Sequence, residues 1–192
     1  MAGRADLGNP GDVNRGRAVT LVVVVAALAA IGLLTSSAFA RSNSSTASLR
    51  VLNRQVFGAI NAFRRAHGLS TLRESAGLDR SALAHSLQMG SKGYFAHNSA
   101  NGQQFFVRIE RYYRLKGYSH WTVGENLLWS SPTVSAAQAM KLWIASPPHL
   151  ENLETAKWRD LGVSAVSVAN AGGVYGGQTV TIVTTDFGVR SK

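Results

Sequence analysis

The sequence predicts an α+β domain that follows an export segment, and three observations lead to this fold class. An apolar stretch lies near the start of the chain, the middle repeats apolar residues at helical spacing, and β-branched residues gather near the end. Helical and strand patterns that occupy separate parts of one chain are typical of α+β domains.

Residues 18–40 carry no charged side chain and follow two closely spaced arginines. A basic start, an apolar middle and a small-x-small end at Ala40 predict that 1–40 is a secretory signal peptide. The stretch is nearly long enough to cross a bilayer, so an uncleaved anchor is the alternative. Its fading into Thr and Ser before Ala40 favours cleavage. On either interpretation Arg41 and all later residues lie outside the cytoplasm. They are secreted if the signal is cleaved, and they are anchored at the outer face of the cytoplasmic membrane if it is not. Residues 18–40 contact the membrane, transiently in the first case and permanently in the second.

A Ser-rich tether is expected at 41–47 and a single domain at 48–189. The domain is long enough to bury a core without covalent cross-links. This matters because the chain has no cysteine, which excludes thiolate catalysis and Cys-based metal sites.

The charge balance is basic. The chain has 20 Lys and Arg against 10 Asp and Glu; removing the three Arg and two Asp of 1–40 leaves 17 against 8, a formal charge of +9. Outside the cytoplasm the matching partners are an anionic cell-wall polymer or lipid, and not nucleic acid. Alternatively, the charge only keeps the protein soluble. One local concentration of basic residues covers 108–116.

Apolar residues at three- and four-residue steps predict a long helix that begins near Leu49 and ends before Gly68. The same spacing predicts a second helix over 76–92, with Gly93 as its terminator. A loop then leads to a third helix near 103–115.

A fourth helix is expected to begin with Ser131 as N-cap and Pro132 in the first helical position, and to run to Ser146. The two prolines at 147–148 cannot continue it. We therefore expect His149 to open a new short helical segment.

Two segments near the end of the chain are predicted strands because they are rich in β-branched residues. Residues 162–169 alternate imperfectly, which fits a strand covered on both faces, and 179–187 are denser still in Val, Ile and Thr. A glycine-containing turn separates them, so an antiparallel hairpin packed on the helices is expected.

Three ionisable side chains are expected in conformationally restricted segments. His97 lies in a loop, Glu125 lies in a Gly-Glu-Asn segment interpreted as a loop, and His149 follows two prolines. Such segments often carry functional groups, and two imidazoles with a carboxylate suit zinc or another divalent cation. No His-Glu-x-x-His motif is present, so spacing alone leaves a shared site open. His67 is interpreted as a helix cap and His85 as a core residue.

Eight segments taken in order resemble the CAP superfamily of cysteine-rich secretory, antigen-five and pathogenesis-related proteins, and most closely its bacterial, cysteine-free, SCP-like members. The segments are 52–72, 78–89, 93–97, 108–118, 124–126, 143–152, 161–163 and 185–188. The resemblance implies an α-β-α sandwich, in which an antiparallel sheet lies between helical layers.

The resemblance also implies a cleft formed by two His and two Glu. By motif these positions fall on His97, Glu125 and His149, while the second Glu falls on Ser146, three residues after Trp143. Serine cannot supply a second anionic ligand, so weaker divalent binding is expected than in members with all four residues.

The function that this resemblance implies is a non-enzymatic extracellular binding module, with a cleft for a divalent metal, a lipid or a cell-wall ligand. The alternative is a metal-assisted hydrolase of cell-wall or peptide substrates, with Glu125 or a metal-bound water as the base. A variant of it uses Ser146 as a nucleophile activated by His149. A third interpretation is a structural surface protein. No Gly-x-Ser-x-Gly segment and no cysteine nucleophile occur, which favours binding.

Overall fold

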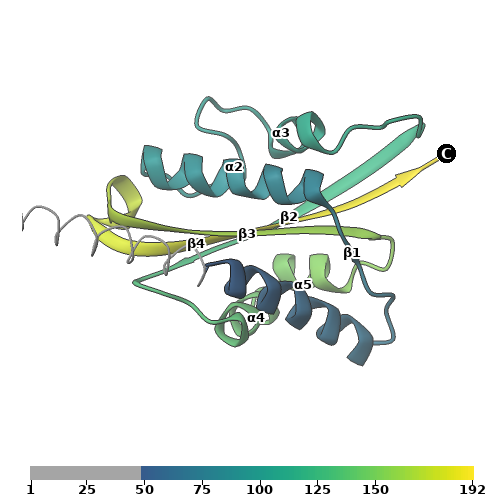
Figure 1. Cartoon of the computed structure of the whole chain (residues 1–192), viewed down its shortest axis with the longest axis horizontal. Coiled ribbons are helices and arrows are strands. Elements are labelled where there is room, and N and C mark those ends of the chain that lie inside the picture. The colour runs from purple at the N-terminus through teal and green to yellow at the C-terminus, as the bar shows by residue number, and fades with distance from the viewer. Residues whose placement is uncertain (1–48) are drawn as a thin grey trace, which may run out of the picture. The chain divides into compact units, whose positions relative to one another are not determined.

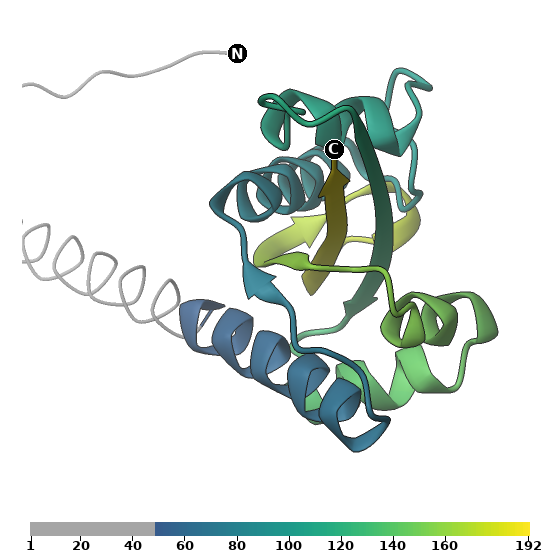
Figure 2. The same ribbon diagram turned by 90° about the vertical axis from the view of Figure 1, so that its right-hand side faces the viewer.

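The computed structural model describes residues 49–192, and the predicted signal peptide and tether lie outside the described residues. A sheet lies between two helical layers, as Figures 1 and 2 show from two directions. Helices α2 (Ala76–Lys92) and α3 (Phe105–Tyr112) cover one face. The other face is covered by the N-terminal helix (49–66), α4 (Ala136–Ile144) and α5 (Pro147–Glu154). The predicted α-β-α sandwich is confirmed.

The sheet has four strands in the order β1-β3-β4-β2. They are β1 (Arg73–Glu74), β2 (His120–Ser130), β3 (Asp160–Ala171) and β4 (Gln178–Ser191). Strand β4 pairs antiparallel with both β2 and β3, which confirms the predicted hairpin, while the two-residue β1 pairs parallel with β3. The sequence patterns did not predict β1 or β2.

The expected loop around Glu125 was wrong, because the Gly-Glu-Asn segment lies inside β2. Gly124 serves close packing there rather than a turn. A Cβ at this position would lie 2.6 Å from Asn152 Oδ1 and 2.9 Å from a carbon of the Trp158 ring. The missing side chain therefore lets the segment around α5 approach the strand.

The predicted start of the fourth helix was also wrong. Helix α4 begins at Ala136, because Ser135 and Gln138 form a reciprocal capping box. The Ser131 hydroxyl instead donates to the Thr179 carbonyl at 2.9 Å, which ties the preceding turn to β4. The predictions for α2 and α5 are confirmed, including a left-handed Gly93 (φ 70°) after α2 and a helix that starts at the proline pair and contains His149.

The domain has its own hydrophobic core. Among the described residues, three apolar clusters with members between Leu49 and Val189 form a core within this domain. Trp143 is almost fully buried, and its indole N–H donates to the Leu127 carbonyl at 3.2 Å, which joins α4 to β2. Within 49–192, no helix combines the length and the apolarity that a bilayer crossing requires.

Candidate functional site

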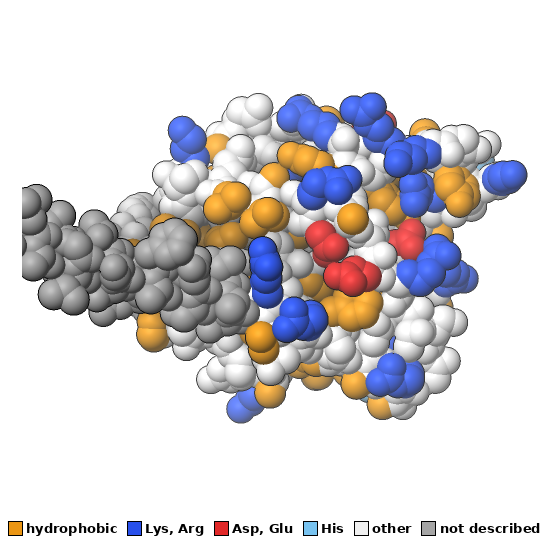
Figure 3. Space-filling model, in the orientation of Figure 1, with side chains coloured by type: hydrophobic (Ala, Val, Ile, Leu, Met, Phe, Trp, Pro, Cys, Tyr) orange, Lys and Arg blue, Asp and Glu red, His pale blue; other side chains and the backbone are white. Residues whose placement is uncertain are grey.

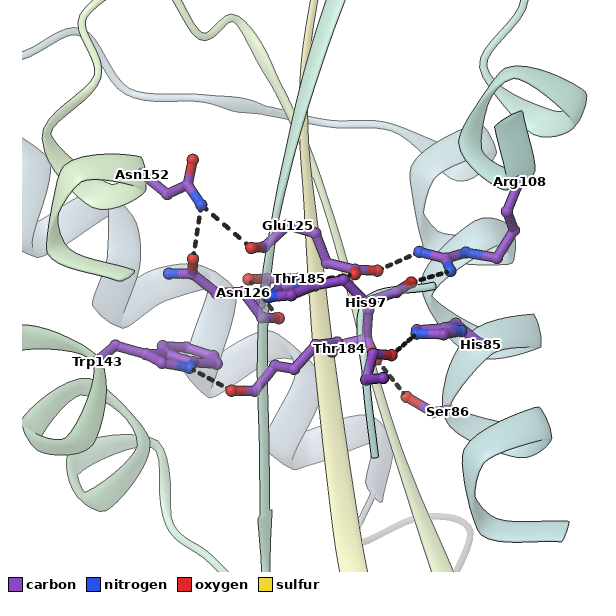
Figure 4. A network of polar contacts seen from close by, with 12 residues as sticks. His85, Ser86, His97, Arg108, Glu125, Asn126, Trp143, Asn152, Thr184 and Thr185 are labelled. Atoms are coloured by element: carbon purple, nitrogen blue, oxygen red, sulfur yellow. Dashed lines mark hydrogen bonds and ion pairs between the residues drawn. The ribbon is translucent and has the colours of Figure 1, made fainter. Parts of the chain in front are cut away.

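Three side chains from separate elements meet at the β2 edge of the sheet (Figure 4). His97 from the loop after α2 approaches Glu125 on β2, with 2.8 Å between Nδ1 and Oε1. Arg108 from α3 pairs with the other carboxylate oxygen, Oε2, and also donates to the His97 carbonyl at 3.1 Å. We call these three residues the Glu125 cluster.

Arg108 is the member that sequence reasoning missed, since it was counted only within the basic concentration at 108–116. It is 6% exposed, and Glu125 is 3% exposed. A buried carboxylate needs a charged or hydrogen-bonding partner, and here the guanidinium provides both. Arg108 lies three positions after Phe105, the first residue of α3. Nothing in the neighbouring sequence indicates that it pairs with a buried carboxylate.

Asp186 on β4 lies opposite Glu125 in the register of the sheet. The Glu125 carbonyl points out of the sheet edge and accepts from Asn152 Nδ2 at 3.1 Å, so this is a non-hydrogen-bonded pair, in which side chains approach most closely. Asp186 is fully buried, and neither carboxyl oxygen has a hydrogen-bond partner among the described residues. Burial and the nearby Glu125 raise the pKa of Asp186 well above its ordinary range, which favours the protonated carboxyl group.

The same burial raises the pKa of Glu125 to about 7, although Arg108 acts in the opposite direction. Burial, and then the Arg108 charge, lower the pKa of His97. The pKa of His149 is lowered by burial and also by His97, which places the two imidazoles within electrostatic reach of each other. Both rings are therefore neutral at neutral pH, and each can donate and accept a hydrogen bond.

His149 is positioned by two asparagines. Asn126 donates to the His149 carbonyl at 3.0 Å. Asn152 in turn donates to the Asn126 side-chain oxygen at 2.9 Å (Figure 4). These bonds join α5 to β2 directly beside Glu125. The His149 Nδ1 atom is buried without a hydrogen-bond partner among the described residues.

Ser146 is the N-cap of α5, and its side chain makes no capping hydrogen bond. Within the described chain no hydrogen bond joins its hydroxyl to His149 or His97. A serine nucleophile needs such a bond to an adjacent base. The version of the hydrolase alternative that uses Ser146 as a nucleophile therefore lacks, among the described residues, the hydrogen bond that would activate this serine.

The residues present do not fit a metal site in which Glu125 is a ligand. Both of its oxygens are already engaged by His97 and Arg108, and a cation beside the guanidinium would be repelled. In residues 49–192 no group of three or more His, Cys, Asp or Glu side chains is arranged to hold a metal ion. The imidazoles of His97 and His149 remain as the candidate ligands for zinc. Zinc binding therefore stays a prediction from the sequence.

Of the other histidines, His85 is fully buried, as predicted, and its Nε2 lies 2.9 Å from the Ala96 carbonyl. Burial lowers the pKa of His85 to about 3, which keeps the ring neutral. The prediction for His67 is also confirmed, since its Nδ1 lies 2.8 Å from the Phe63 carbonyl at the end of the N-terminal helix.

A model of the cysteine-rich secretory protein family, CAP, matches residues 57–186. The protein YkwD of Bacillus subtilis (strain 168) is 29% identical over 125 residues, which cover 65% of this chain and 46% of YkwD. This chain thus spans about half the length of that curated relative.

Two solved structures share the fold. One is an extracellular protein containing an SCP domain from Bacillus anthracis, with a TM-score of 0.59, 24% identity and coverage of 78% of this chain and 43% of that chain. The other is an outer surface protein from Borrelia burgdorferi, with a TM-score of 0.56, 18% identity and coverage of 70% and 90%.

Proposed function

The chain belongs to the cysteine-rich secretory protein (CAP) family, and on that premise we propose that it is an exported, non-enzymatic binding module of the bacterial cell envelope. We propose that the surface around His97 and His149, which we call the His97 cleft after the family resemblance, binds an anionic cell-wall polymer. Relatives described as extracellular and outer-surface proteins support the location. The basic start and apolar stretch of 1–40 support export.

The observation that carries the proposal is that both carboxylate oxygens of Glu125 are occupied. A general base must reach the proton that it removes, yet Glu125 is buried and joined to Arg108 and His97. The Glu125 cluster instead links a loop, a helix and a strand. Such a link fixes the shape of the cleft wall, which is what a binding site needs.

The part of the cluster that solvent reaches is His97, whose side chain is 49% exposed. Its Nδ1 is engaged by Glu125, so the neutral ring offers Nε2 as a hydrogen-bond acceptor to a hydroxyl or amide group of the polymer. The formal charge of +9 on residues 41–192 favours anionic ligands at long range. A cell-wall polymer rich in phosphate or carboxylate groups combines these requirements.

The test is sedimentation of residues 41–192 with purified cell wall at rising salt. We expect binding that weakens with ionic strength, because screening reduces electrostatic attraction. His97→Ala and His149→Ala should weaken it further. The matched control is His67→Ala, an exposed histidine outside the cleft, which should bind as the wild type does. Absence of wild-type binding, or equal loss in all three variants, would contradict the proposal.

A metal-assisted hydrolase is the second candidate, and the raised pKa of Glu125, about 7, is the observation that favours it. A general base works best when its pKa lies near the working pH. Incubation with peptidoglycan and casein, with and without chelator, tests this function. Products that disappear in both Glu125→Gln and chelator-treated samples would establish hydrolysis and displace the binding proposal.

A further inference from the structure

A pocket of about 600 Å³ lies at the opposite edge of the sheet from the Glu125 cluster. It exists because β1 is so short. Strand β1 pairs only with Asp160 and Leu161, so from Val163 onward β3 has no strand on its β1 side. The N-terminal helix and α2 form the two walls of the resulting gap.

The unpaired edge of β3 is buried, and side chains close it to the addition of another strand. The Val163 N–H donates to Asp79 at 2.9 Å, and the Ala165 N–H donates to Asn53 at 2.8 Å. Because side chains occupy these backbone N–H groups, they are not available for pairing with a strand of another chain. The pocket is therefore suited to a small group rather than to an extended peptide.

The lining combines apolar and basic side chains. Phe57, Leu83 and Val163 supply apolar surface, and Leu83 is 41% exposed. Three arginines also line the pocket, namely Arg50 and Arg54 from the N-terminal helix and Arg80 from α2. None of the three guanidinium groups forms an ion pair or a hydrogen bond with another described residue. Figure 3 shows this face, with basic side chains around a small acidic and apolar centre.

Two acidic residues, Glu74 and Asp79, line the pocket as well. Asp79 is engaged by the Val163 N–H, whereas Glu74 is exposed to solvent. Among the described residues, the three guanidinium groups are therefore the charged donors of the pocket that have no partner. Arginine binds phosphate through two parallel hydrogen bonds, and the apolar residues suit the start of a hydrocarbon chain.

The position of the pocket along the chain points to the source of such a ligand. Residues 41–48 separate Ala40 from the N-terminal helix, and eight residues reach at most about 28 Å. Arg50 and Arg54 lie in the first part of that helix. If residues 18–40 remain in the membrane, as an anchor would, this short link leaves both arginines within reach of the lipid headgroups.

We propose that this pocket binds the phosphate headgroup of an anionic phospholipid at the outer surface of the cytoplasmic membrane. Binding there would orient the domain on the membrane and leave the His97 cleft, at the other edge of the sheet, free for its own ligand. The released form of the protein would use the same pocket to return to the membrane.

The experiment is sedimentation of residues 41–192 with vesicles of phosphatidylcholine, alone or mixed with phosphatidylglycerol. The wild type should bind only the mixed vesicles. The double variant Arg50→Glu/Arg54→Glu should lose at least about tenfold in affinity, since each basic residue near the surface adds to the attraction. Leu83→Ser should also weaken binding, which general charge attraction does not predict.

The matched control is Arg111→Glu/Arg114→Glu, which changes the net charge equally at the basic concentration on and after α3. Circular dichroism checks that every variant is folded. Equal losses in the two double variants, a larger loss in the control, or no wild-type binding would each overturn the proposal. Full competition by free inorganic phosphate at a concentration no higher than that of the anionic lipid would also overturn it, because the lipid would then contribute nothing beyond its phosphate.

Discussion

Glu125 on β2 and Asp186 on β4 face each other across a non-hydrogen-bonded pair of the sheet, and both carboxyl groups are buried. Only one cation, Arg108, contacts this pair directly among the described residues. Two buried negative charges beside one guanidinium would leave a net buried charge, which is costly. A protonated Asp186 removes that cost and leaves Glu125 and Arg108 as a matched ion pair.

The first prediction concerns the pH dependence of stability. The pKa of Asp186 is raised in the folded protein, so the folded state holds a proton that the unfolded state releases. Such a group stabilises the fold fully below its unfolded pKa, and this contribution is lost as pH rises through the folded pKa. Asp186→Asn cannot ionise, so the variant should lose less stability than the wild type between about pH 5 and pH 8.

Urea unfolding of both proteins at several pH values measures this difference. Glu125 acts in the same direction, because its pKa is raised to about 7, and His85 acts in the opposite direction at low pH, because its pKa is lowered to about 3. Both residues are present in both proteins, so the comparison reports the difference that the Asp186 carboxyl group makes. Parallel pH curves for wild type and Asp186→Asn would show that Asp186 is ionised in the folded protein.

The second prediction concerns the ion pair. Arg108→Met leaves Glu125 buried without its cation, and breaking a buried pair in this way costs about 3–5 kcal/mol of unfolding free energy. Arg108→Met/Glu125→Leu removes both charges and should recover most of that loss. Denaturant unfolding of the wild type, the two single variants and the double variant gives the coupling energy. A coupling near zero would mean that the two side chains do not depend on each other.

Local signals and long-range contacts explain which parts could be predicted. Helix α2 was predicted with both ends correct, because its pattern and Gly93 act within one segment. Strand β2 was missed because its centre, Gly124 to Leu128, contains no β-branched residue and owes its conformation to pairing with β4. Arg108 was missed for the same reason: its burial is decided by contacts with Glu125 and His97, which lie 17 and 11 residues away.

The third prediction concerns zinc. If His97 and His149 alone bind it, calorimetric titration should show a weak site that His149→Ala removes and Glu125→Gln leaves in place. Ser146→Glu adds a carboxylate at the position where the family resemblance places the second Glu. It should raise the affinity about tenfold, the scale on which neighbouring groups alter metal sites. Loss of zinc binding in Glu125→Gln would make Glu125 a ligand after all, and no heat in any variant would exclude the site.

The fourth prediction tests the packing that holds His149 in place. Gly124→Ala inserts a Cβ 2.6 Å from Asn152 Oδ1 and 2.9 Å from the Trp158 ring, so α5 or the strand must move. Overpacking of this kind costs about 1–3 kcal/mol, and it should also weaken cleft binding because Asn152 supports the Asn126 contact to His149.

The control is Gly58→Ala in the N-terminal helix, where a Cβ meets nothing within 4 Å. That change should stabilise the protein by up to about 1 kcal/mol, because alanine is the better helix former. Thermal unfolding and cell-wall sedimentation of both variants measure the two effects. A Gly124→Ala protein as stable as the wild type would mean that α5 is not held tightly against β2.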